Sequence, residues 1–145
     1  VKALNKMQAS NLIDELLGTP ALVRTLLSNA EGEPSERTVK SVSALHERDT
    51  IVLGRLQRLM RETAPPYFKE LPSLDAAIAA APIPGDMDAF LGAFDTARGD
   101  LVSLLMNLAL KDWERIATDD VEGEISLAEE VERHVEFDEA VRARI

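Results

Sequence analysis

Residues 39–60 read VKSVSALHERDTIVLGRLQRLM, and the architecture of the chain can be inferred outward from this stretch. Its apolar residues recur in steps of three and four, the spacing that places side chains on one face of an α-helix. The resulting stripe consists of Val39, Val42, His46, Asp49, Leu53, Leu56 and Met60. His46 and Asp49 are its polar members. The stretch therefore predicts a long helix whose buried face contains a histidine and an aspartate.

The segments on the N-terminal side also have a helical period. Residues 5–29 predict a first helix, and Pro20 within it predicts a kink or a restart because proline lacks the backbone N–H. A loop follows, and Ser35 is a suitable N-cap for the second helix, which is expected to run to about residue 63.

On the C-terminal side, prolines between residues 64 and 88 predict a long connection with at most a short helix at 73–81. A third helix is expected from about residue 86 to 117, and a fourth from Ser126 to Ile145. The pair Ser126 and Glu129 has the spacing of a capping box. No strand alternation is evident. The chain is therefore predicted to be all-α, one domain over residues 1–145, a four-helix bundle with a long crossover between helices two and three.

Composition excludes several classes of protein. The chain has 145 residues, 16 Lys+Arg, 26 Asp+Glu and no cysteine. Disulfide scaffolds, cysteine-ligated zinc and a cysteine nucleophile are therefore excluded. A net charge of −10 is unsuited to nucleic acid, whose phosphates require clustered Lys and Arg. No apolar run is long enough for a membrane span or signal segment, so we expect a cytoplasmic protein without a membrane partner.

The fourth helix repeats the pattern of the second. His134 and Asp138 stand one turn apart on or beside its apolar stripe. Burying such groups costs several kcal/mol unless they are paired or ligate a metal. Two interpretations are open: a divalent-metal site, since imidazole and carboxylate suit zinc, nickel, iron or manganese, or a His–Asp hydrogen-bonded network that fixes helix register without any ligand.

With these features the chain resembles the DinB-like family, small metal-binding four-helix bundles related to thiol-dependent transferases. The resemblance covers nearly the whole chain and is a pattern of short motifs. They are Leu16-Leu17-Gly18-Thr19-Pro20, Val42 with His46-Glu47-Arg48-Asp49, Phe90 to Phe94 with Arg98, Trp113-Glu114-Arg115, Gly123 with Ser126-Leu127, and Asp138 to Ile145.

The resemblance implies a divalent metal, often zinc or nickel, held by three histidines. His46 matches the ligand on the second helix, whereas Phe137 and Val141 stand at the positions of the other two and cannot coordinate a metal. A shift of one turn offers His134 and Asp138 as substitutes. The candidate metal ligands are therefore His46, His134 and Asp138, and the cofactor is a divalent metal or none.

Two functions follow from these alternatives. One is a DinB-like bundle whose metal site is degenerate or altered and which serves as a non-catalytic binding module. The other is a metal-dependent enzyme of the thiol transferase or hydrolase type, in which Asp49 orients an imidazole. Any thiol would be a small molecule from outside, because the chain has no cysteine. The resemblance also implies a homodimer. A helical signalling bundle is disfavoured by the absence of cysteine.

Overall fold

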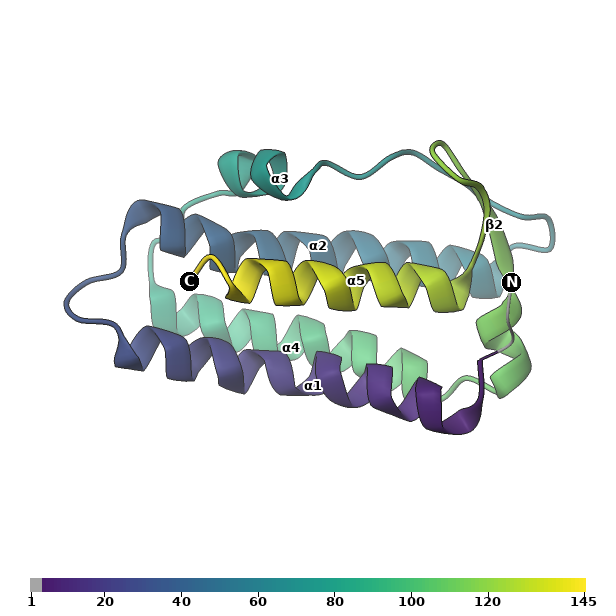
Figure 1. Cartoon of the computed structure of the whole chain (residues 1–145), viewed down its shortest axis with the longest axis horizontal. Helices are drawn as coiled ribbons and strands as arrows, with labels where there is room; N and C mark the ends of the chain where they lie inside the picture. The colour runs from purple at the N-terminus through teal and green to yellow at the C-terminus, as the bar shows by residue number, and fades with distance from the viewer. Residues whose placement is uncertain (1–3) are drawn as a thin grey trace.

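The computed structural model describes residues 4–145 and is mostly helical. Four long helices lie side by side along the longest axis of the molecule, and a short helix lies outside them (Figure 1). The helices are α1 (Lys6–Asn29), α2 (Glu36–Arg61), the short α3 (Leu74–Ala80), α4 (Met87–Met106) and α5 (Leu127–Arg142). Within residues 4–145, none of these helices is both long and apolar enough to cross a membrane.

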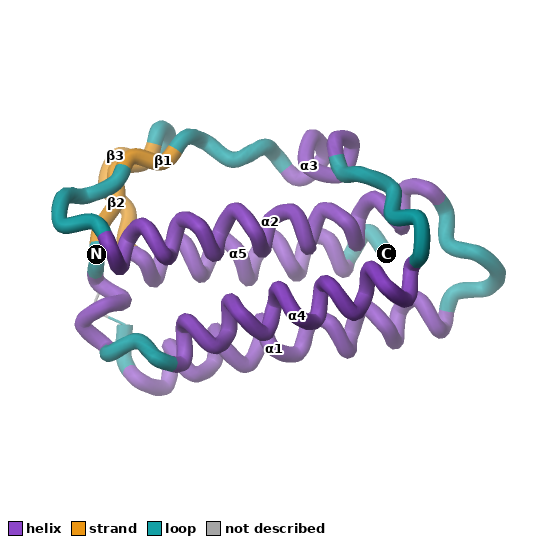
Figure 2. The backbone as a smooth tube through the Cα atoms, turned by 180° about the vertical axis from the view of Figure 1, so that it is seen from behind, coloured by secondary structure: helices purple, strands orange, loops and turns teal. Residues whose placement is uncertain are grey.

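Each long helix packs mainly on two of the others. α1 and α2 follow one another in the chain, yet both make their main helix contacts within the bundle with α4 and α5. α4 and α5 thus lie between α1 and α2 (Figures 1 and 2). Consequently α1 and α2 are joined across the bundle mainly through α4 and α5.

Local capping signals place the helix starts where the sequence predicts them. Ser35 accepts a hydrogen bond from the backbone N–H of Thr38, and Ser126 forms the expected capping box with Glu129. α1 runs unbroken through Pro20, so no restart occurs there. The connection between α2 and α4 covers residues 62–86 and includes α3.

The region after α4 differs from the prediction. The third long helix ends at Met106, not near residue 117, and is followed by a 3-10 helix, η1 (Leu110–Glu114). A three-stranded sheet, ordered β1-β2-β3, then covers one end of the bundle (Figure 2). β1 (Tyr67–Phe68) is parallel to β2 (Ile116–Asp119), which is antiparallel to β3 (Gly123–Ser126). Strands of two to four residues are too short for alternation to be detected in a sequence.

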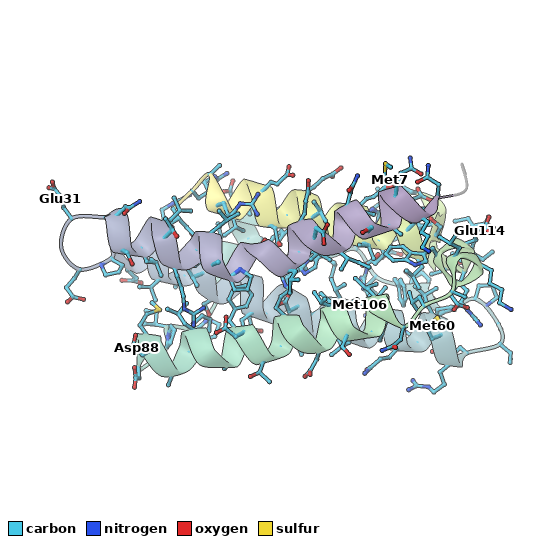
Figure 3. All side chains as sticks on the ribbon, turned by 90° about the horizontal axis from the view of Figure 1, so that it is seen from below. Met7, Glu31, Met60, Asp88, Met106 and Glu114 are labelled. Atoms are coloured by element: carbon cyan, nitrogen blue, oxygen red, sulfur yellow. The ribbon has the colours of Figure 1, made fainter. Side chains whose placement is uncertain are left out.

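The apolar core is divided along the bundle axis into two clusters. The first, at the sheet end, includes Leu16, Leu56 and Leu101. The second, toward the α1–α2 loop, includes Val23, Phe94 and Val141. Figure 3 marks the two ends, with Glu31 and Asp88 at one and Met7, Met60 and Glu114 at the other. Between the clusters, each long helix contributes a buried polar residue.

Two glycines provide a test of the local backbone. Gly123 has a φ of 80°, whereas Gly54 lies inside α2, and an added Cβ would meet no atom within 4 Å at either position. Gly123→Ala should therefore destabilise the protein by about 1 kcal/mol through backbone strain alone. Gly54→Ala should stabilise it by about 1 kcal/mol, because alanine is the better helix former. Urea unfolding measures both changes in stability. Effects of the same sign would contradict the backbone conformations assigned to the two glycines.

Candidate functional site: a buried charged layer and an adjoining pocket

The polar layer is organised around the guanidinium of Arg98, on α4, which is 1% exposed. Its Nη1 donates to Oδ2 of Asp138 at 2.6 Å, and its Nη2 donates to Oδ1 at 2.8 Å. Its Nε lies 3.1 Å from both carboxylate oxygens of Asp49. Asp49 is on α2 and Asp138 on α5, so one side chain joins three helices.

The fourth helix, α1, is joined to the same centre through its backbone. Arg98 Nη1 donates to the carbonyl oxygen of Leu16 at 2.7 Å. In a regular helix this carbonyl would accept from the N–H of residue 20, but Pro20 has none. Thr19 Oγ1 also donates to Asp138 Oδ2, at 2.8 Å. Pro20 thus leaves the Leu16 carbonyl free to accept from Arg98, and Thr19 supplies a hydroxyl that donates to Asp138.

His134 completes the layer from α5. Its Nε2 lies 2.7 Å from Oδ1 of Asp49, and both side chains are fully buried. A carboxylate offers only acceptors, so Nε2 carries the hydrogen of this bond. In the neutral imidazole the other nitrogen, Nδ1, is then an acceptor. That atom is buried and has no hydrogen-bond partner in residues 4–145.

The surroundings of Arg98 keep it charged. Burial by itself would lower the pKa of its guanidinium, but the hydrogen bonds and charge of Asp138, together with the charge of Asp49, raise that pKa above its ordinary value. An ion held in the interior is tolerated only where its partners compensate for the lost hydration. The layer therefore contains a permanent internal cation.

Of the three candidate metal ligands, His134 and Asp138 lie in this layer, and both are already engaged by other side chains. His134 is bonded to Asp49, and Asp138 to Arg98 and Thr19. His46 is only partly buried, and its ring packs edge-on against Phe90 with centroids 5.5 Å apart. Within residues 4–145, no group of three or more His, Asp or Glu side chains is placed to hold a metal ion.

The residues present do not fit a divalent metal. All four carboxylate oxygens of Asp49 and Asp138 accept a hydrogen bond from Arg98. A metal there would have to share those oxygens with a buried guanidinium, and like charges repel strongly away from water. Phe137 and Val141, at the positions that the resemblance gives to histidine ligands, belong to an apolar cluster.

A second buried ion pair lies beside this layer. Arg55 on α2 donates to Glu130 on α5 at 3.1 Å and also to the backbone oxygen of Lys69. The Arg55 side chain is buried in this pair, with the residue 8% exposed. Like Asp49, which is bonded to His134, it faces α5. The ion pair borders a pocket that His134 also lines.

Sequence reasoning did not identify Arg98 as a site residue. It lies four residues after Phe94 and three before Leu101, both fully buried, so its position on the apolar stripe was available as a signal. The other signal is Pro20 inside a helix, which always leaves the carbonyl four residues earlier without its usual donor.

The fold is shared with a solved structure. YfiT from Bacillus subtilis, described as a probable metal-dependent hydrolase with an unusual four-helix bundle topology, matches all of this chain and 87% of its own, with a TM-score of 0.78 and 18% identity. Similarity at this identity shows the fold alone. No protein-family model matches the chain, and no curated protein matches it.

Replacing Arg98 should be far more damaging than breaking an exposed pair. Arg98→Met leaves two buried carboxylates without their cation, and we expect a loss of about 3–5 kcal/mol in unfolding free energy. The matched control is Arg24→Met, which breaks an exposed pair with Asp95 and should cost at most about 1 kcal/mol. Adding Asp49→Asn and Asp138→Asn to the Arg98→Met chain should recover part of the loss.

Urea unfolding followed by circular dichroism measures these differences. Equal losses for the two arginine variants would show that the buried cation is not needed.

Proposed function

We propose that this chain is a DinB-like bundle in which an internal cation, Arg98, has replaced the divalent-metal centre, and that it acts as a metal-independent binding module. The observation behind the proposal is that Arg98 contacts every carboxylate oxygen of Asp49 and Asp138. A guanidinium in this position engages all four oxygens and balances one of the two negative charges that would otherwise attract a metal.

Two further features support a binding role. Phe137 and Val141 are buried in an apolar cluster where the resemblance requires metal ligands, so any ligand is bound without them as metal ligands. The buried layer also adjoins a pocket, and His134 belongs to both. A small pocket next to a rigid layer of buried hydrogen bonds is a suitable place to hold a ligand, because little side-chain freedom is lost on binding.

The competing proposal is a metal-dependent enzyme that uses His46, His134 and Asp138. The similarity in fold to YfiT favours it, since that protein is described as a probable metal-dependent hydrolase. It would require His134 and Asp138 to exchange their present partners, Asp49 and Arg98, for a metal ion. The homodimer implied by the resemblance is also a proposal, which the molecular mass in solution tests.

Metal analysis distinguishes the two functions. Tag-free protein should contain far less than one equivalent of zinc, nickel, iron or manganese, both as the wild type and as His46→Ala. Its thermal midpoint should be the same with a chelator as with added zinc, because a ligand that does not bind the native state cannot stabilise it. One equivalent of metal in the wild type that is lost in His46→Ala would overturn the metal-independent module and favour the metal-dependent enzyme.

A further inference from the structure

The pocket beside the charged layer is lined by polar and charged groups that have no partner of their own within residues 4–145. It is a cavity of about 230 Å³ between α2, α5, the β2–β3 hairpin and residues 70–72 of the connection. The connection and the hairpin lie on the same side of α2 and α5 (Figure 1). A cavity of this size holds a metabolite-sized molecule rather than a large cofactor.

Most charges in the wall are paired with each other. Arg55 donates to Glu130 at 3.1 Å. Arg133 lies 2.8 Å from Glu122 and 3.4 Å from Asp119. These five side chains need no ligand to satisfy their charges.

Arg48 is different. Its Nη2 donates to the backbone oxygen of Pro72 at 3.0 Å, and its guanidinium stacks 4.0 Å from the centre of the Phe137 ring. No carboxylate of residues 4–145 lies within ion-pair distance of it, although it is partly buried and lines the pocket. Burial lowers the pKa of this guanidinium, against the charge of Glu130. A carboxylate from a ligand would be a favourable partner for it.

His134 supplies the second unmatched group. Its Nε2 is committed to Asp49, and its Nδ1 is a buried acceptor with no partner in residues 4–145. A buried polar atom without a hydrogen bond is costly, and native structures have few of them. His134 lines the same pocket as Arg48, so one small molecule could satisfy both groups if it displaces the atoms that now cover Nδ1.

We propose that this pocket binds a small aliphatic carboxylic acid with a hydrogen-bond donor on the carbon next to the carboxylate, that is, an α-amino or α-hydroxy acid. The carboxylate pairs with Arg48, and the donor bonds to Nδ1 of His134. Val52, Leu71 and Val121 line the pocket and suit an aliphatic side chain. The inference rests on the proposed function, since it names the ligand class of the metal-independent pocket.

The charges of the wall favour the α-amino acid of the two. Three arginines line the pocket, against four acids, of which Glu70 is exposed and forms no ion pair within residues 4–145. An ammonium group next to the ligand carboxylate would therefore meet a slightly negative wall, whereas a second negative charge, as on a phosphate, would be repelled.

Titration with four matched probes tests the proposal: L-valine, α-hydroxyisovalerate, isovalerate, which lacks the donor, and isobutylamine, which lacks the carboxylate. We expect L-valine and then α-hydroxyisovalerate to bind, each at least about tenfold tighter than the other two, as expected for the loss of one charged or buried hydrogen bond. Isovalerate binding as tightly as L-valine, or no binding of either acid that has a donor, would overturn the proposal.

Nitrogen NMR of ¹⁵N-histidine-labelled protein provides a readout in the wild type. The Nδ1 resonance of His134 should shift on addition of L-valine, because that atom accepts a new hydrogen bond. His46, which does not line the pocket, is the internal control. Binding without any change at His134 would contradict the assigned contact.

Arg48→Met should weaken L-valine binding by about tenfold or more. The matched control, Arg58→Met, removes an arginine from the same helix that does not line the pocket and should bind like the wild type. All titrations are made in chelator, so the absence of valine binding refutes the ligand class, whereas the metal content of the free protein tests the proposed function separately.

Discussion

The guanidinium of Arg98 is the group on which the rest of the structure depends. It lies between the carboxylates of Asp49 and Asp138 and also donates to the carbonyl of Leu16, so it links α2, α5 and α1 to its own helix, α4. Since α1 and α2 pack mainly on α4 and α5, this polar centre is where all four long helices meet. Apolar clusters on either side exclude water from it, which strengthens its hydrogen bonds and makes any unpaired charge there costly.

Such a layer contributes more to specificity than to net stability. Apolar side chains tolerate small shifts between helices, whereas a guanidinium with fixed donor directions accepts only one register of its partners. Desolvation offsets much of the attraction between the charges, so an apolar layer of the same volume could be equally stable. Pro20 has a matching role in α1: it costs one helical hydrogen bond and leaves the Leu16 carbonyl available to Arg98. The layer thereby fixes His134, a residue that also lines the pocket and whose Nδ1 has no hydrogen-bond partner within residues 4–145.

Local signals in the sequence predict much of this structure. Features that depend on packing between helices cannot be predicted from those signals. The helical period placed Asp49, His134 and Asp138 on buried faces, where each is 1% exposed. Their partners were not predictable, because pairing across helices depends on a register that no single helix specifies. Arg98 was overlooked for the same reason: an arginine on an apolar stripe is explained only once two carboxylates are known to face it. The sheet was missed because β1 and β2 are very short and far apart in the chain.

The central claim is the proposal that an internal arginine, Arg98, takes the place of a divalent-metal centre in this chain. Anomalous diffraction at the zinc edge, from crystals grown with zinc, tests it most directly. We predict the guanidinium of Arg98 between Asp49 and Asp138, as here, with no anomalous peak at these residues or at His46 and His134. An ordered zinc ion coordinated by His134 and Asp138, with Arg98 displaced, would contradict the claim.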